Sequence, residues 1–402
     1  MQCNRLYQKV TLGWLRIALA MMVIDLHYHF FSHIFDTVYK RFDFTGKIVF
    51  ASDGCLAVRG FFVISGFLVS HILEKRYPSN SVHDFVHFTI SRYLRIYPLF
   101  LIMFLVFLIT SVTLHNFQDF LRTLGVATLL PYGIYDFFSK LGRPIWATMH
   151  LSFWGAPWTL PLDFAFYPLG FFLHKNKKAL YVAFFMLIVY FCIAWAVSSP
   201  PEKHLFFSDH TWWNGFFFST APPNLLAFIS GMISYNYSSN KKSHPWLLIL
   251  SSIVVFYISY TPFGLSVFAA DMLAIISFSI IVSELAKNGQ NRFESFMGNF
   301  TFSIYLTHQY VLYMLQRNLT LSNIKIIAFL IDIILGILIA IFIEERLIEK
   351  RRRSWISRIK KQGTILSGIE FKPAYANIAL ALIACSTIYY TASLLLTINL
   401  WK

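Results

Sequence analysis

The chain has 402 residues, of which 57% are hydrophobic and only 13% are charged. A soluble domain averages about a quarter charged residues, so this composition excludes a soluble globular protein and indicates a membrane protein. The formal net charge of +15 does not indicate nucleic-acid binding, because the basic residues lie between apolar segments and form no groove interleaved with exposed aromatic side chains. The four cysteines are scattered and predict neither a disulfide framework nor a zinc site.

Apolar runs along the chain predict an all-α polytopic membrane protein, because each is long enough for a membrane-spanning helix of about 20 residues. Residues 120–135 are apolar but short and broken by Gly and Pro, so we interpret them as a re-entrant or interfacial segment. The predicted spans lie at 12–32, 49–73, 94–113, 157–174, 179–199, 215–236, 246–262, 265–285, 296–316, 323–345 and 376–400.

Basic residues between these runs predict the orientation of the chain. With a cytoplasmic N-terminus, the cytoplasmic segments hold about twice as many Lys and Arg residues as the outer segments, in agreement with the positive-inside rule. An odd number of spans then places the C-terminus on the periplasmic side. The basic sequence EKRRRSWISRIKK ends a predicted ten-helix core. We therefore divide the chain into a membrane domain at 1–350, a basic cytoplasmic loop at 351–375 and an additional transmembrane helix at 376–402.

The first run, LGWLRIALAMMVIDLHYHFF, holds the densest set of polar residues. Arg16 and His27 are separated by three helical turns plus about 20°, so they lie on one face, roughly 16 Å apart along the axis. In one interpretation Arg16 reaches lipid phosphates and His27 lies at the interface. In the other, both face the bundle interior and His27 accepts a proton, since the unperturbed pKa of histidine is near working pH.

The second run, DGCLAVRGFFVISGFLVSHIL, repeats glycine at every sixth position. Gly54, Gly60 and Gly66 predict a seam at which another helix packs closely. Arg59 lies about ten residues into this run, where an ionisable side chain costs about 2.5–3.5 kcal/mol and therefore needs a partner or a function. We include Arg59 among the candidate site residues.

The third and fourth runs carry further charged residues. Arg92 and Arg95 in SRYLRIYPLF are neighbours on one helix face. Such a pair suits phosphate or pyrophosphate binding, and the alternative is a routine basic flank of a span. In APWTLPLDFAFYPLG, Trp158 fits an outer interfacial belt. Asp163 lies inside the membrane, so we expect a partner such as His27 or an arginine.

Ionisable residues also occur in the later runs. His308 lies within GNFTFSIYLTHQYVL in the ninth run. It is a candidate site residue, and the alternative is a hydrogen-bonded packing group. Asp271 and Asp332 are interpreted as members of polar pairs between helices.

Taken together, these segments resemble the acyltransferase 3 family of membrane acyltransferases over roughly residues 10–350. Two departures are Asp163, where the family usually has Glu, and Arg351, where it has Pro. The features that match, in the family's order, are Arg16 with His27, AVRGFFVISGFL (57–68, against FFxxSGFL), RYLRIYP (92–98, against RxxRIYP), PWTLPLDFAFYPL (157–169, against WTLxxExxFY) and SIYLTH (303–308, against SYxxYLxH).

The resemblance implies an enzyme that transfers an acyl group, most often acetyl, from acyl-CoA. The implied acceptor is a sugar hydroxyl of lipopolysaccharide O-antigen, exopolysaccharide or another envelope glycan, with no bound cofactor or metal. The implied location is the bacterial inner membrane, in contact with membrane lipid. Many members carry an SGNH hydrolase-like domain after the membrane part, and if that domain is needed here, we expect a separate periplasmic partner to supply it. The alternative from another class is a transporter or glycan flippase, which we disfavour because no inverted repeat is evident and the polar residues concentrate in spans one to four.

The resemblance also implies roles for individual residues. His27 removes the proton from the attacking hydroxyl or is transiently acylated, and Asp163 orients it. Arg16 lines the path of the donor. Ser65 and backbone N–H groups near Gly66 are expected to stabilise the oxyanion. The remaining residues expected to bind acyl-CoA or the acceptor are Arg92, Arg95, Trp158 and Tyr167.

Overall fold

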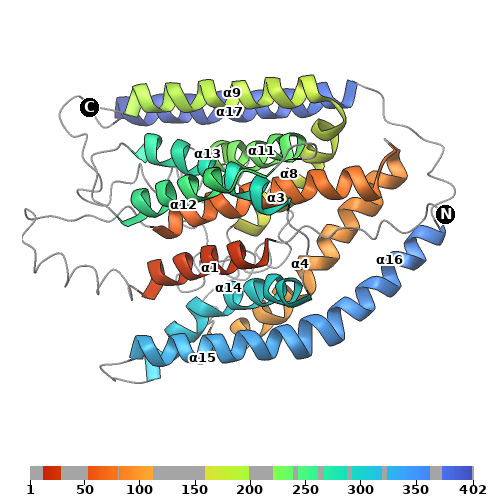
Figure 1. Ribbon diagram of the computed structural model, residues 1–402, viewed down its shortest axis with the longest axis vertical. Helices are drawn as coiled ribbons and strands as arrows, with labels where there is room; N and C mark the ends of the chain where they lie inside the picture. The colour runs from red at the N-terminus through yellow and green to blue at the C-terminus, as the bar shows by residue number, and fades with distance from the viewer. Residues whose placement is uncertain are drawn as a thin grey trace, which may run out of the picture.

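The computed structural model describes residues 12–28, 53–79, 81–111, 159–198, 221–238, 243–260, 267–287, 292–318, 324–362 and 374–400. Within these ranges the chain forms eleven continuous helices (Figure 1). One of them, from Ile324 to Gln362, consists of three consecutive segments, α15, η2 and α16. The bounds are α1 (Gly13–Tyr28), α3 (Asp53–Arg76), α4 (Val82–Ser111), α8 (Thr159–Lys175), α9 (Lys177–Ser198), α11 (Ala221–Ser238), α12 (Pro245–Tyr260), α13 (Val267–Leu285), α14 (Arg292–Asn318), α15 (Ile324–Leu338), η2 (Ile339–Glu349), α16 (Lys350–Gln362) and α17 (Ala374–Leu400).

Each predicted apolar run coincides with one of these helices, and two of the described helix boundaries differ from the predicted ones by ten residues or more. α4 begins at Val82 instead of 94, because its first turns are helical yet too polar to be recognised as part of a span. Residues 351–362, predicted as part of a loop, form α16 because the preceding helix continues into it without a break. Glu349 forms ion pairs with Arg352 at 2.7 Å and Arg353 at 2.9 Å, which stabilise this continuation. The predicted segment 120–135 lies outside the described residues.

The helices of the described part of the chain are those of an integral membrane protein. By length and composition, three are long and apolar enough to cross a bilayer: Leu56–Arg76, Val82–Ile109 and Ile327–Arg358. Large apolar side chains also point outward, including Phe185 on α9 and Ile249 and Phe256 on α12. Surfaces of this kind suit lipid and not water. The number of crossings and their orientation remain predictions.

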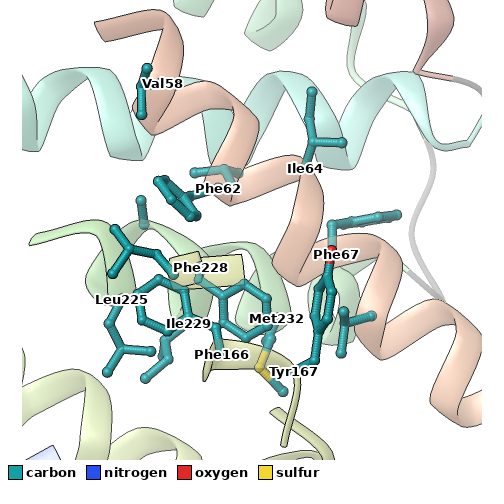
Figure 2. Packing of buried hydrophobic residues seen from close by; sticks show 14 of the residues in the cluster. Val58, Phe62, Ile64, Phe67, Phe166, Tyr167, Leu225, Phe228, Ile229 and Met232 are labelled. Carbon is teal, nitrogen blue, oxygen red and sulfur yellow. The ribbon is translucent and has the colours of Figure 1, made fainter. Parts of the chain in front are cut away.

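Helix α3 lies at the centre of the bundle and packs against α1, α8, α11 and α13. Figure 1 shows α9 and α17 side by side along one edge, with α15 and α16 along the opposite edge. Aromatic and aliphatic side chains of α3, α8 and α11 fill the core between these three helices (Figure 2). Among them, Phe62, Phe166 and Phe228 form a chain of ring contacts, with centroids 5.5 and 5.6 Å apart.

Glycine allows α3 and α11 to approach until their backbones touch. A Cβ atom added at Gly66 would lie 1.8 Å from the Phe228 carbonyl oxygen, and one at Gly231 would lie 2.0 Å from the Val63 carbonyl oxygen. Both positions therefore exclude any larger residue. The seam predicted from the glycine spacing is present at Gly66, and its partner is α11.

A buried polar cluster joins α3 to two other helices. Arg59 is fully buried and forms a 2.9 Å ion pair with Asp271 on α13. It also donates a short hydrogen bond to the side-chain oxygen of Asn224 on α11. The interpretation of Asp271 as a helix–helix partner is therefore confirmed. Arg59, a candidate site residue from the sequence, is engaged in this cluster and does not line the cavity described below.

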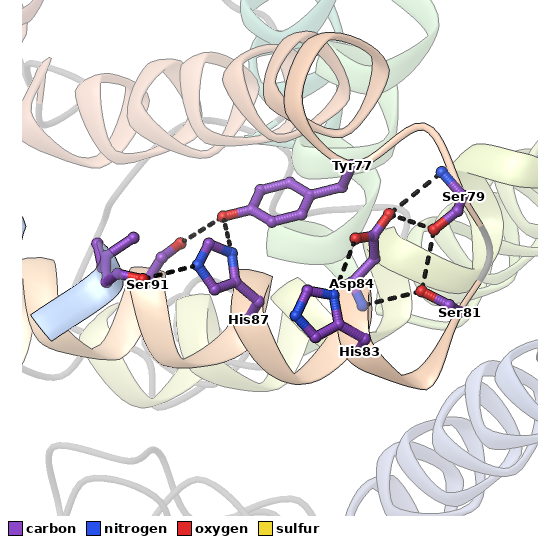
Figure 3. A network of polar contacts seen from close by, with 8 residues as sticks. Tyr77, Ser79, Ser81, His83, Asp84, His87 and Ser91 are labelled. Atoms are coloured by element: carbon purple, nitrogen blue, oxygen red, sulfur yellow. Dashed lines mark hydrogen bonds and ion pairs between the residues drawn. The ribbon is translucent and has the colours of Figure 1, made fainter. Parts of the chain in front are cut away.

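A polar network fixes the start of α4 against α3 and α16 (Figure 3). The Ser81 hydroxyl accepts a 3.1 Å hydrogen bond from the backbone N–H of Asp84, which caps the first turn of α4. His87 Nδ1 lies 3.0 Å from the Tyr77 hydroxyl, and its Nε2 lies 3.4 Å from the Ile356 carbonyl oxygen of α16. The Tyr77 hydroxyl also lies 3.4 Å from Ser91 Oγ. This network holds the turn of α4 that immediately precedes Arg92.

Candidate active site

A cavity of about 160 Å³ lies between α1, α3, α4, α8, α14 and η2. Its volume is about that of a cavity able to hold a benzene ring. Six candidate residues predicted from the sequence come together in its wall, although they belong to four separate helices. They are Arg16, Ser65, Arg92, Arg95, Asp163 and Tyr167.

Three arginines from two helices give the cavity an excess of unsatisfied donors. Arg92 is only 8% exposed, and its Nε has no hydrogen-bond partner among the residues that the structure describes. Its guanidinium lies 5.8 Å from the centroid of the Phe88 ring. Within the described ranges, no hydrogen bond or close ion pair joins Arg16 or Arg95 to another residue, and the three cations repel one another. Burying unpaired cations is costly, so the arrangement suits an anionic ligand.

The carboxylate of Asp163 lies among these cations. Its Oδ1 accepts a 2.9 Å hydrogen bond from Ser65 Oγ, and its charge is attracted to Arg16 and Arg92. The partner of Asp163 is thus a serine with nearby arginines. In the described part of the chain, no hydrogen bond or ion pair joins Asp163 to His27. Helical periodicity gives the face of α1 but not the helix that packs on it. Since Ser65 directs its proton to Asp163, it orients the carboxylate instead of an oxyanion.

The backbone near Gly66 does not have the role predicted from the sequence. α3 is continuous from Asp53 to Arg76, so its N–H groups in this region bond to carbonyl groups four residues earlier. They are therefore not available to an oxyanion. Gly66 itself faces α11, away from the cavity wall. The other predicted binding residue, Trp158, lies outside the described residues.

Glu344 is a cavity residue that the sequence analysis missed. It is 8% exposed, lines the cavity and accepts a 3.3 Å hydrogen bond from Ser303 Oγ. It lies in the middle of η2, a π-helical segment of 11 residues, and such wider turns are common at functional sites. The available signal was an acidic residue at the end of an apolar run, but the predicted span ended at 345. No role was predicted for Glu344 from the sequence.

His27 and His308 form a second polar group next to the cavity. His27 Nδ1 lies 3.3 Å from His308 Nε2, and the ring centroids are 4.9 Å apart. Farther along the same helices, Gly298 of α14 faces Arg16 of α1: a Cβ added at Gly298 would lie 3.2 Å from an Arg16 guanidinium nitrogen. The two contacts follow the same order in both helices, so α1 and α14 run parallel and both polar residues of α1 face α14.

Tyr305 connects this histidine pair with the cavity. Its side chain lines the cavity, and its hydroxyl lies 2.9 Å from Thr159 Oγ1 at the start of α8. One turn later in α14, His308 Nδ1 lies 2.9 Å from the Tyr305 carbonyl oxygen. The two parts of the site are thus adjacent and share one turn of α14.

The fold and this site define an all-helical integral membrane protein with a buried, arginine-lined cavity and a neighbouring histidine pair. A sequence model of the acyltransferase 3 family, described as an acyltransferase domain, matches residues 10–345. The chain belongs to this family and is an acyltransferase, so the transporter alternative is not retained. Comparison with curated proteins and with solved structures found no match.

Proposed function

We propose that the protein is a membrane O-acyltransferase that transfers an acyl group from acyl-CoA to a sugar hydroxyl, with acetyl as the proposed acyl group. The acceptor is a sugar of lipopolysaccharide O-antigen, exopolysaccharide or another envelope glycan. The observation that carries the proposal is the cluster of Arg16, Arg92 and Arg95 in one cavity, with no hydrogen bond or close ion pair to their guanidinium groups from the described residues. CoA supplies a diphosphate and a 3′-phosphate, which are suitable partners for such groups.

The distance between the arginines and His27 supports the choice of donor. Arg16 and His27 are 11 positions apart in α1, a rise of roughly 16 Å. The pantetheine arm of CoA has twelve bonds between diphosphate and sulfur, the length of about four residues of extended chain, or roughly 14 Å. A donor whose phosphates bind at the arginines therefore reaches the neighbourhood of His27 with its thioester.

The proposed reaction begins when His27 accepts the proton of the sugar hydroxyl as its oxygen attacks the thioester carbon. The C–O bond forms, the C–S bond breaks, and CoA leaves as a thiolate that receives the proton from His27. The products are the sugar ester and CoA thiol. In the covalent variant of this scheme, His27 itself receives the acyl group and passes it to the sugar. Asp163 and Glu344 offset part of the arginine charge and orient the guanidinium groups.

The proposed location is the bacterial inner membrane, with the N-terminus in the cytoplasm and the C-terminus in the periplasm. The basic residues between spans support this orientation, which places the arginine cavity toward the side that contains acyl-CoA. α17 lies beyond the matched residues and packs against α8, α9 and α11.

The test is to purify the protein in lipid nanodiscs and measure release of CoA thiol from acetyl-CoA in the presence of membrane glycan. We expect release in wild type and a strong reduction in His27→Ala at equal protein level. In parallel, cells that express wild type should show a surface glycan heavier by one acetyl group per modified sugar. A wild-type protein that neither releases CoA nor adds mass to any envelope glycan would exclude the proposed donor and acceptor.

A further inference from the structure

The contacts of His27 and His308 with each other and with backbone carbonyl oxygens indicate which ring nitrogen carries each proton. His308 is fully buried, and its Nδ1 lies 2.9 Å from the Tyr305 carbonyl oxygen. A carbonyl oxygen only accepts hydrogen bonds, so His308 Nδ1 carries a proton and donates it. In the neutral ring, His308 Nε2 is therefore an acceptor.

The same reasoning applies to His27. Its Nδ1 lies 2.8 Å from the Val23 carbonyl oxygen and 3.3 Å from His308 Nε2. Both neighbours are acceptors, so His27 Nδ1 carries a proton that it shares between them. The lone pair of neutral His27 is consequently on Nε2, which is the nitrogen able to accept a proton or attack an acyl carbon.

We propose that His308 is a positioning residue that holds His27 in the tautomer with a basic Nε2. This inference rests on the proposed function, in which His27 accepts the hydroxyl proton. When His27 Nε2 takes that proton, the ring becomes an imidazolium, and its Nδ1–H donates more strongly to the lone pair of His308 Nε2. The orienting carboxylate of many catalytic triads has the same task. Here a neutral, buried imidazole performs it without placing a second charge in the membrane.

The surroundings of His308 keep its ring in place. The hydroxyl oxygen of the preceding residue, Thr307, lies 3.1 Å from the Ser303 carbonyl oxygen and makes a short contact with a carboxyl oxygen of Asp332 on α15. Thr307, His308 and Asp332 are all fully buried. This turn of α14 is therefore fixed against α15, and the acceptor nitrogen of His308 has a defined position toward α1.

The test compares His308→Gln with His308→Leu. Glutamine places an amide oxygen near the position of Nε2 and keeps an acceptor for His27, whereas leucine removes it. We expect His308→Leu to lower kcat for acetyl-CoA turnover by about 10- to 100-fold, less than the roughly 10⁴-fold cost of a mis-set tautomer in a triad with a carboxylate. We expect KM to remain unchanged and His308→Gln to retain most of the activity. His174→Leu, which removes another buried imidazole, is the matched control.

A second measurement does not depend on acyl-CoA. Diethyl pyrocarbonate acylates the uncharged nitrogen of imidazole, and peptide mass spectrometry follows its reaction at His27. We expect this reaction to be several-fold slower in His308→Leu than in wild type, His308→Gln and His174→Leu. The double variant His27→Ala/His308→Leu should be no less active than His27→Ala, since a positioning residue has no effect once the residue it positions is gone.

Two outcomes would overturn the inference: an unchanged or faster reaction at His27 in His308→Leu, or equal losses of kcat in the Gln and Leu variants. If His27 reacts as expected but wild type releases no CoA, the role of His308 stands and the proposed donor is wrong. If wild type turns over acetyl-CoA and His308→Leu matches it, the proposed function stands and the role of His308 is wrong.

Discussion

Ser65 on α3 donates a 2.9 Å hydrogen bond to Asp163 on α8, and both residues line the cavity that contains Arg16 and Arg92. The carboxylate receives its orientation from α3, while its charge is attracted to guanidinium groups from α1 and α4. Side chains of α1, α3 and α4 thus all interact with this one carboxylate of α8. Because no other described residue forms a hydrogen bond or close ion pair with these arginines, the charge of Asp163 should matter more than its exact length.

Asp163→Asn should lower acetyl-CoA turnover by about 100-fold, within the range for groups that act on charge in a buried site. The substitution keeps the shape of the side chain but removes the negative charge that offsets the arginines. The measurement is CoA release by purified protein at matched concentration. Asp163→Glu, which restores the residue usual in the family, should retain substantial activity. Equal loss in both variants would show that side-chain length, and not charge, governs this position.

Arg92→Lys should raise the KM for acetyl-CoA by about 10- to 100-fold. Lysine keeps the positive charge but lacks the planar fork, so at least one charged hydrogen bond to phosphate is lost, worth about 1.5–3 kcal/mol. The measurement is the dependence of turnover on acetyl-CoA concentration. Arg353→Lys on α16 is the matched control, because the side chain of Arg353 is 75% exposed and its pair with Glu349 lies at the surface. A KM that is unchanged in Arg92→Lys would contradict phosphate binding there.

Much of the fold could be predicted because long apolar runs mark membrane helices without reference to tertiary contacts. The same is true of Arg16, Arg92 and Asp163, whose cost inside a membrane identifies them individually. The motifs of the family then indicated that they belong to one site. That these residues lie in one cavity could therefore be predicted from the sequence.

The remaining features depend on which helix faces are in contact. Periodicity places His27 on the same face of α1 as Arg16, but only packing shows that this face meets His308 of α14. The glycine spacing indicates a seam at Gly66, but not that α11 forms its other side. Glu344 enters the cavity because the helix continues through a π-helical segment past the predicted end of the span. A hydropathy pattern contains no signal for that change of helical geometry.

Arg59→Leu should lower the free energy of unfolding by about 3–5 kcal/mol, because it leaves the carboxylate of Asp271 buried without its cation. The measurement is thermal or denaturant unfolding of the protein in detergent or nanodiscs. The double variant Arg59→Leu/Asp271→Leu should recover part of the loss, since both charges are then absent. Equal stability of wild type and Arg59→Leu would show that the buried pair contributes nothing.

Gly66→Ala and Gly298→Ala should separate folding from donor binding. At Gly66 the new methyl group meets the backbone of α11, which cannot move aside without displacing the helix, so we expect a loss of stability of about 1–3 kcal/mol or more. Among the described residues, the new methyl group at Gly298 meets the end of the Arg16 side chain alone, which is flexible and can shift. Gly298→Ala should therefore fold normally but show a raised KM for acetyl-CoA, because Arg16 is displaced from the cavity. The measurements are the unfolding midpoint and the kinetics of CoA release. If Gly298→Ala leaves both unchanged, the position of the Arg16 guanidinium does not contribute to donor binding.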